Sequence, residues 1–535
     1  MRYLVPNVVT GLEEPLEKVA LRLARRLGFD IHALRAIQCV RRAIDARRKH
    51  DVHFVCHYEI ELKHPLKHLP RGVRRLEHSQ LEPVAPDIFT RRPEKTGSVI
   101  VVGAGPAGLF AALALAEAGF RVTLLERGKP VEHRMRDIGR LRSRGELNPE
   151  SNICFGEGGA GTYTDGKLYT RIKHPFVRWV LQTFVRFGAN KDILVDAHPH
   201  LGTDKLVRIV RRMREHLIGL GVDYRFECRV DDLLVRENRI HGVRTASGES
   251  MHAEFVILAT GHSARDTFER LYRMGLPMEA KPFAIGLRAE HPQSIINACQ
   301  YGQFAGHQRL GAAEYRLSYQ VEDEHLGRRG IYTFCMCPGG LIVPSPTEPG
   351  HMAINGMSNA KRAGRWANAG VVAQVSPDDL VRHGLHAHSL VGMTFQREVE
   401  RACHQAVGNR YAAPAMRLVD FLSRATSSTP VASSFKPEIV PADLSELLPT
   451  WLADPLRKGL QAFGRKMPGF ITEEANLLAI ESRTSSPIRM LRNKRMECVT
   501  VAGLMPVGEG AGYAGGIVSA AVDGLRAAQS IIERY

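Results

Sequence analysis

The stretch that most constrains this chain is residues 98–127, SVIVVGAGPAGLFAALALAEAGFRVTLLER. Its apolar strand turns through Gly103, Gly105 and Gly108 into a helix, and a second strand ends at Glu126. In a βαβ nucleotide-binding unit, glycines at this spacing permit the tight turn, let a pyrophosphate approach the backbone and let the helix pack closely on the strand. The free N–H groups and the dipole at the helix start favour phosphate. The stretch therefore predicts a parallel sheet that binds a dinucleotide.

A membrane span is the competing interpretation of the same stretch, because residues 99–116 carry no charge. Three glycines and a proline near its start would break such a span, and the charged continuation from Arg121 to Arg127 does not suit one. Glu126 lies 18 residues beyond Gly108, where a carboxylate can accept hydrogen bonds from ribose hydroxyls and would repel a 2′-phosphate. Strand, helix and acid together favour the dinucleotide site, and we expect no membrane span.

Length and composition fit a globular protein of the cytoplasm. The 535 residues are enough for two or three domains, and 44% hydrophobic with 24% charged residues is ordinary for a soluble chain. The N-terminus acquires acids before any sustained apolar run, so no secretory leader is expected. The nine cysteines include no CxxC pair, which favours reduced thiols over a disulfide framework. We find no zinc ligand set and expect no metal site.

The net charge of +17 raises the question of a nucleic-acid partner. Residues 1–97 hold 19 Lys and Arg against 12 Asp and Glu. Such an excess fits either an RNA or phosphate-rich partner, or a solvated or domain-contact surface. Basic runs of this kind are more often solvated surfaces, so nucleic acid is the less favoured partner.

Hydrophobic periodicity and composition predict three domains. Residues 1–80 have the order β-α-β-β, which suggests a small basic α+β domain of ferredoxin-like or similar type. A Pro-rich, charged linker is expected over 81–96. A discontinuous nucleotide-binding domain is expected over 97–280 and 485–535, with a mixed α+β substrate domain over 281–484 inserted into it.

Three further segments belong with the first glycine turn. A second glycine cluster, FGEGGAGTYTDG, covers residues 155–166 and implies backbone that passes close to something flat or phosphorylated; a mobile surface loop is the alternative. A buried strand ends at Thr260 and Gly261, as expected beside the first strand of the sheet. Near the C-terminus we expect a strand over 499–502 and then a second glycine-rich helix start over 506–521, PVGEGAGYAGGIVSAA. It would supply more backbone N–H groups to one long cofactor.

These motifs resemble the two-domain flavoproteins of the glutathione-reductase-like FAD superfamily. More closely, the chain resembles a bacterial group of largely uncharacterised FAD-dependent dehydrogenases, or NAD(FAD)-utilizing oxidoreductases. The resemblance spans almost the whole chain and rests on RAIDARRK (42–49), NICFGEGGAGTYTDGKL (152–168), ATGHSARDTF (259–268), FCMCPGG (334–340), NGMSNAKR (355–362) and ESRTSSPIR (481–489).

The resemblance implies an α/β fold with a Rossmann-type FAD-binding domain, and FAD as the cofactor. The residues implied to bind it are Gly103, Gly105, Pro106, Ala107 and Gly108 at the pyrophosphate; Glu126 and Arg127 at the adenosine ribose; Gly159, Ala160, Gly161 and Thr162 at the flavin or pyrophosphate; Val230 at the adenine; Thr260 and Gly261 on the adenosine side; and Gly508, Glu509, Gly516 and Ile517 at the ribityl chain and flavin edge.

One position departs from the family pattern. Gly508-Glu509 stands where relatives in the wider superfamily usually have Gly-Asp, so the longer acid can shift the ribityl contact or bridge it through water. Only one full βαβ fingerprint is present, and the late glycine-rich segment suits a cofactor long enough to cross the domain. NAD(P)H, if it is used, is therefore expected as a transient electron donor in the substrate cleft.

Candidates for acid–base or redox chemistry are His262, Cys335 and Cys337. His262 follows the Thr-Gly strand end and can be a proton donor or a hydrogen-bonded structural histidine. Residues i and i+2 of a strand share a face, so both sulfurs of the CMC sequence are expected to point into the cleft. They can act as a redox pair or pack as small hydrophobic groups. Arg483 begins a polar loop that can hold a phosphate or a substrate carboxylate, or form a plain turn.

The leading prediction is an FAD-dependent oxidoreductase that transfers a hydride between flavin N5 and a small organic substrate. The alternatives are an RNA-acting flavoprotein that uses the basic N-terminal domain, a flavin monooxygenase, and a non-catalytic flavin-binding protein. The sequence leaves the substrate and the oligomeric state open.

Overall fold

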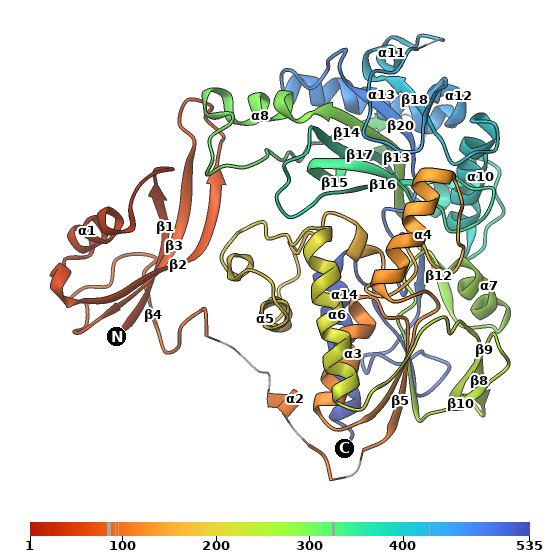
Figure 1. Ribbon diagram of the computed structural model, residues 1–535, viewed down its shortest axis with the longest axis horizontal. Coiled ribbons are helices and arrows are strands. Elements are labelled where there is room, and N and C mark those ends of the chain that lie inside the picture. The colour runs from red at the N-terminus through yellow and green to blue at the C-terminus, as the bar shows by residue number, and fades with distance from the viewer. Residues whose placement is uncertain (83–86, 91, 95, 324–326, 427) are drawn as a thin grey trace.

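The computed structural model describes almost the whole chain, and the predicted linker over 81–96 lies partly outside the described residues. The residues left undescribed are 83–86, 91, 95, 324–326 and 427. The described chain is a mixed α/β structure in which a small N-terminal sheet, a parallel sheet and a large mixed sheet follow one another (Figure 1). None of its helices is both long and apolar enough to cross a bilayer.

The N-terminal region is an antiparallel sheet covered on one face by a helix. Apolar residues at helical spacing, Val19, Leu23 and Leu27, are buried against the sheet. Residues 63–73 form no helix, because Pro65 interrupts them, and so the second helix of a ferredoxin-like unit is absent from this described segment. The strand order is β2-β3-β1-β4, from β1 (Arg2–Thr10), α1 (Leu16–Leu27), β2 (Leu34–Asp45), β3 (His53–Leu62) and β4 (Arg74–Leu76).

The βαβ unit lies at the centre of a five-stranded parallel sheet. The order is β22-β11-β5-β6-β7, from β5 (Ser98–Val102), β6 (Arg121–Leu125), β7 (Asp223–Arg225), β11 (Phe255–Leu258) and β22 (Leu504–Pro506). Figure 1 shows α3 (Pro106–Glu117), α6 (Thr203–Gly219) and α14 (Ile517–Ile532) on one side of β5, and β8 (Val230–Arg236), β9 (Arg239–Thr245) and β10 (Ser250–His252) on the other. Both faces of the sheet are therefore covered.

This covering explains the unbroken apolar runs of the parallel strands. Val99 and Val101 of β5 point into the core shared with the helices, whereas Ile100 and Val102 point into the core shared with the β8–β10 meander. In a strand that is buried on both faces, apolar residues follow one another instead of alternating with polar residues.

The strand predicted over 499–502 is wrong, because β22 begins only at Leu504. The Glu497 carboxylate accepts the Gly503 N–H at 2.7 Å, and the Cys498 N–H donates to the Leu504 carbonyl, so the intervening residues form a turn. Gly503 has φ +78°. The turn makes the strand begin five residues later than predicted, at Leu504, which pairs with Val256 of β11.

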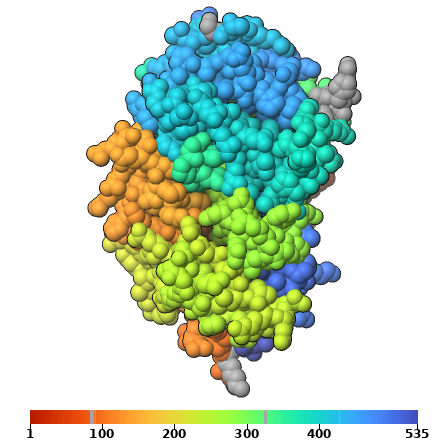
Figure 2. Space-filling model, turned by 90° about the vertical axis from the view of Figure 1, so that its right-hand side faces the viewer, coloured from red at the N-terminus to blue at the C-terminus, as the bar shows by residue number. Residues whose placement is uncertain are grey.

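A large mixed sheet covers the carboxyl edge of the parallel sheet. The strand order in this sheet is β14-β15-β17-β13-β20-β18-β19, and β16 (Ile354–Met357) pairs with β15 beside it. The strands of the main order are β13 (Phe283–Pro292), β14 (Ser318–Asp323), β15 (Gly327–Pro344), β17 (Trp366–Val375), β18 (Ala413–Arg417), β19 (Ile439–Pro441) and β20 (Asn476–Glu481). Helices α10 (Val391–Ala406) and α13 (Thr450–Lys466) contribute to its core. Figure 2 shows this region seated over the parallel-sheet region. The predicted domain boundaries stay predictions.

Candidate functional site

The main cavity of the described structure has a volume of about 1090 Å³ and is bordered by segments far apart in the sequence. They include the turn after β5, the second glycine cluster, the end of β11, part of β15 and the loop before α14. In open parallel sheets, ligands bind beyond the carboxyl ends of the strands, and this cavity lies there. Folding thus brings the four predicted glycine-rich or strand-end segments to one space.

Most of the predicted cofactor residues border this cavity. Those that border it are Gly103, Gly105, Pro106, Ala107, Glu126, Arg127, Gly159, Ala160, Gly161, Val230, Thr260, Gly261, Gly508, Glu509, Gly516 and Ile517. Gly108 and Thr162 lie behind the wall. A Cβ at Gly108 would be 1.9 Å from the Gly103 carbonyl oxygen, and a Cβ at Gly158 would be 2.0 Å from the Thr162 hydroxyl. Gly108 thus fits the close packing at the turn, and contacts of Gly108 and Thr162 with a cofactor stay predictions.

Two helix N-termini open onto the cavity. Helix α3 begins after Gly105 and α14 begins after Gly516, and no described side chain caps either start. The two helices pack so closely that Gly524 has no room for a side chain. A Cβ at Gly524 would be 2.0 Å from the Ala107 carbonyl oxygen. Uncapped N–H groups and two helix dipoles at one place make an anion-binding surface suited to a pyrophosphate.

The glycines separate into those that the protein itself requires and those that border open space. Gly103 has φ +102°, and a Cβ there would lie 2.5 Å from the Ala259 carbonyl oxygen. At Gly105 the nearest described atom to a Cβ would be 3.8 Å away, and at Gly261 and Gly516 none lies within 4 Å. Gly261 and Gly516 also have φ of +72° and +133°, which favour glycine, whereas Gly105 has φ −78° and only the cavity space distinguishes it. All three positions leave open space that a side chain would fill, and the residues present fit a dinucleotide.

Glu126 and Arg127 are already held by the protein. The Glu126 carboxylate accepts the N–H groups of Ala104, Gly128 and Gly156 at 2.8, 2.9 and 3.0 Å. A carboxylate has about four acceptor positions, so one remains for a ribose hydroxyl. The Arg127 guanidinium pairs with Glu150 and Asp266 and lies 4.2 Å from the centre of the Phe155 ring. Arg127 therefore fixes this corner of the cavity.

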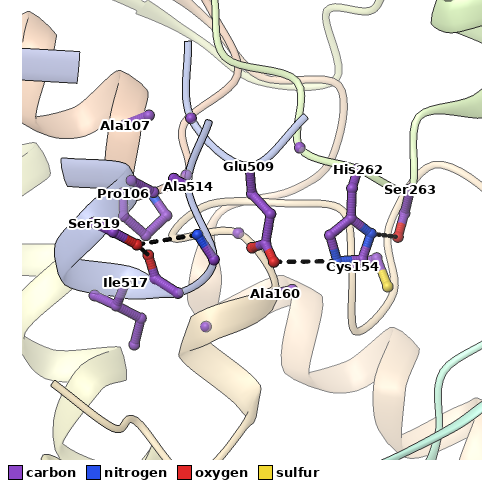
Figure 3. A pocket seen from close by; sticks show the side chains of 18 of the residues that line it. Pro106, Ala107, Cys154, Ala160, His262, Ser263, Glu509, Ala514, Ile517 and Ser519 are labelled. Atoms are coloured by element: carbon purple, nitrogen blue, oxygen red, sulfur yellow. Dashed lines mark hydrogen bonds and ion pairs between the residues drawn. The ribbon is translucent and has the colours of Figure 1, made fainter. Parts of the chain in front are cut away.

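His262 and Glu509 face each other in the cavity (Figure 3). The His262 Nε2 is 3.7 Å from the Glu509 Oε1, and Ser263 Oγ is 3.5 Å from His262 Nδ1. Burial, with the charges of Arg483 and Arg265, lowers the pKa of His262 to about 4, so the imidazole is neutral at pH 7. Burial raises the pKa of Glu509 to about 7. Of the pair, Glu509 is the group that gains or loses a proton near neutral pH.

This pKa gives the ligand-free protein a pH-dependent stability. Because the folded-state pKa of Glu509 lies above its ordinary value of 4.5, its contribution is present below about pH 4.5 and is lost as the pH rises through 7. Glu509→Gln removes the titration. Between pH 5 and 8 the wild type should lose about 2 kcal/mol of unfolding free energy relative to this variant. Urea unfolding at several pH values measures this difference in unfolding free energy. The same pH dependence in the wild type and in Glu509→Gln would contradict the raised pKa of Glu509. Glu438→Gln, which changes an acid on the surface, is the control and should have the pH dependence of the wild type.

The two cysteines of the CMC sequence do not share a face, so that prediction is wrong. The register of β15 against β17 shifts between Phe334 and Cys337, which is a β-bulge, and Cys335 has φ +46°. Cys335 borders the cavity, and Cys337 is completely buried behind it. The bulge turns one sulfur toward the cavity and leaves the other as a packing group that donates to the Cys335 carbonyl at 3.3 Å.

Cys335 is expected to react faster than the other thiols. The neighbouring Cys337 thiol, followed by the charges of Lys167 and Arg288, lowers the pKa of Cys335, whereas burial raises that of Cys299. The thiolate is the reactive form. At pH 7, iodoacetamide should label Cys335 at least about ten times faster than Cys299, as followed by peptide mass spectrometry. Earlier labelling of Cys299, which is also half-buried, would contradict this expectation.

A buried charge cluster that no sequence motif predicted lies behind His262. Glu400 of α10 is completely buried and accepts hydrogen bonds from Arg265 at 2.8 Å and from Arg483 at 3.0 Å. The two guanidinium groups hold the pKa of Glu400 well below its usual range, despite burial. The signal in the sequence was an acid directly after the apolar Val399, within the segment that the structure shows as α10. Arg483, predicted as a loop residue at the substrate, borders the cavity but is paired.

Comparison with protein families gives three matches along the chain. Residues 98–144 match the model "FAD dependent oxidoreductase", and residues 282–484 match "FAD-dependent protein, C-terminal domain-like". Residues 7–61 match a domain of unknown function. The two flavoprotein matches cover the βαβ unit and the large mixed sheet that border the cavity.

Similar proteins include one that covers nearly the whole chain. An uncharacterised protein of Clostridium beijerinckii is 37% identical over 534 residues, which are 99% of this chain and 98% of that protein. The FAD-dependent monooxygenase nodY2 of Hypoxylon pulicicidum is 31% identical over 223 residues, 39% of this chain and 46% of its own length. A solved geranylgeranyl bacteriochlorophyll reductase-like protein of Thermoplasma acidophilum is 13% identical, with a TM-score of 0.34, and covers 82% of this chain and 78% of its own.

Proposed function

Since the chain belongs to a family of FAD-dependent oxidoreductases, we propose that it transfers a hydride between flavin N5 and a small organic substrate. The observation that carries this proposal is the convergence of two uncapped helix N-termini on one cavity that is also bordered by titratable side chains. The starts of α3 and α14 would hold the FAD phosphates. The remaining acceptor position of Glu126 would take a ribose hydroxyl, and Val230 would border the adenine.

When bound, FAD supplies the hydride acceptor or donor at N5, and the protein supplies position and protons. Glu509 holds the exchangeable proton, because its pKa of about 7 keeps both of its forms populated at neutral pH. The neutral His262 imidazole beside it orients that proton. Residues of the large mixed sheet border the cavity opposite the parallel sheet. NAD(P)H, as a transient donor, would enter this same space.

One experiment tests this function. The purified protein is expected to be yellow, with the absorption of bound flavin, and to be bleached anaerobically by NADH, NADPH or a reduced substrate. A colourless protein that takes up no FAD on reconstitution would overturn the proposal. Copurification of RNA, with binding that weakens steeply as salt rises, would support the RNA-acting alternative instead.

A flavin monooxygenase is the second candidate, and the similarity of 223 residues to the monooxygenase nodY2 favours it. The two functions differ in their use of oxygen. After reduction, oxygen consumption that depends on an organic substrate and yields a hydroxylated product supports the monooxygenase. Substrate oxidation or reduction without oxygen incorporation supports the dehydrogenase.

A further inference from the structure

The cavity has an excess of positive charge that the protein does not neutralise. Seven Lys and Arg residues border it, against three acids. Arg127, Arg229 and Arg483 have carboxylate partners. The other four make no ion pair within 4.0 Å among the described residues; they are Lys167, Arg171, Lys281 and Arg316.

The acids of the cavity wall do not compensate these four cations. Glu126 is held by backbone N–H groups, and Asp165 pairs with Arg362. Burial raises the pKa of Glu509, so its negative charge is only partly present at neutral pH. Lys167 and Lys281 are half-buried, whereas Arg171 and Arg316 are exposed. A half-buried cation without a carboxylate partner costs free energy that a bound anion recovers. The two exposed arginines can pair with an anion at the cavity mouth.

Two of the four cations, Lys281 and Arg316, come from outside the segments that would hold the FAD phosphates. Arg316 precedes β14, and Lys281 precedes β13, so both come from the large mixed sheet. Lys167 donates to the Met336 carbonyl at the bulge of β15. The Arg316 guanidinium lies 5.1 Å from the centre of the Tyr169 ring. The charge excess is therefore on the substrate side of the cavity.

Apolar and aromatic side chains border the same part of the cavity. Tyr332 and Phe334 come from β15, Leu317 adjoins Arg316, and Tyr169 and Ile172 come from the segment that carries Lys167 and Arg171. A wall of this composition accepts a flat or apolar body, while the cations accept its charged end.

Building on the proposed function, we propose that the substrate is an anion with an aromatic or apolar body, and that Lys281 and Arg316 bind its carboxylate or phosphate group. Both side chains offer only donors, and the fork of an arginine suits either oxyanion. Lys281 lies near Glu509, so an anion bound there would lie next to the group that exchanges a proton.

The test uses the FAD-bound protein and three probes of similar size: benzoate, phenyl phosphate and the neutral benzamide. Binding is followed by the change in absorption of the bound flavin. At least one anion is expected to bind about ten-fold or more tightly than benzamide, and less tightly as salt rises. Which of the two anions binds better tells a carboxylate substrate from a phosphorylated one.

Variants separate charge recognition from shape. Arg316→Gln and Lys281→Met should each weaken binding of the preferred anion about ten-fold and leave benzamide unchanged. Arg309→Gln is the matched control, because Arg309 is exposed in the same segment as Arg316 and does not border the cavity.

Equal binding of benzamide and the anions, no anion binding, or unchanged affinity in both variants would overturn this inference. If the protein is yellow and shows any of these outcomes, the anion-binding proposal fails and the proposed flavin function stands. If the protein is colourless and takes up no FAD, the proposed function itself fails.

Discussion

Gly105→Val is expected to give a folded protein that no longer retains FAD. Gly105 has φ −78°, which any residue adopts, and the nearest described atom to its Cβ would be 3.8 Å away. The valine side chain would thus project into the cavity where the pyrophosphate approaches the start of α3. Filling that space should weaken FAD binding by about 3 kcal/mol, or roughly 100-fold. Flavin absorption of the purified variant and titration with FAD measure the loss.

Two other glycines make this prediction specific. Gly139→Val places the same side chain on the exposed face of α4 (Val131–Arg144), where no described atom lies within 4 Å of the Cβ, and should leave FAD binding intact. Gly108→Val should fail to fold, because its Cβ would meet the Gly103 carbonyl at 1.9 Å. Retention of flavin by a folded Gly105→Val variant would show that the phosphates do not lie at this turn.

Glu400→Gln is expected to destabilise the protein by about 3–5 kcal/mol, because it leaves buried positive charge without its counterion. Arg265 keeps a second partner in Glu348 at 2.7 Å. Among the described residues, Arg483 keeps the Thr347 hydroxyl, at 2.6 Å, as its one other side-chain hydrogen-bond partner, so most of the cost arises there. The cluster joins α7 (Arg265–Arg273), α10 and the segment after β20, which connect the two large sheets. Unfolding in urea, followed by circular dichroism, measures the change.

The control is an ion pair on the surface. Glu438 pairs with Arg410 at 2.9 Å, and both side chains are more than half exposed, so Glu438→Gln should cost no more than about 0.5 kcal/mol. Because the pKa of Glu400 is lowered in the folded state, its stabilising effect is present at neutral pH and is lost only as the pH falls through that low pKa. A Glu400→Gln variant as stable as the wild type would show that the two arginines find other partners.

Local sequence predicted the elements that depend on local geometry. The βαβ unit, with Gly103 and Gly108, requires a turn and a close packing that few sequences permit, so its motif identifies it wherever it occurs. The strand over 499–502 was misplaced because a hydrogen bond from Gly503 to Glu497 decides where β22 begins. Apolar pattern alone does not contain that hydrogen bond.

The sequence by itself determined the cofactor-binding half of this protein, since glycine spacing, helix start and acid lie within thirty residues of one another. Only the tertiary structure decided the other half. The β15 bulge turns Cys335 toward the cavity and buries Cys337, and folding brings Glu509 to His262 and leaves Lys281 and Arg316 without carboxylate partners among the described residues. Desolvation and charge pairing depend on neighbours that are distant in sequence, and so the chemistry of the substrate side appears only when the sheets close over the cavity.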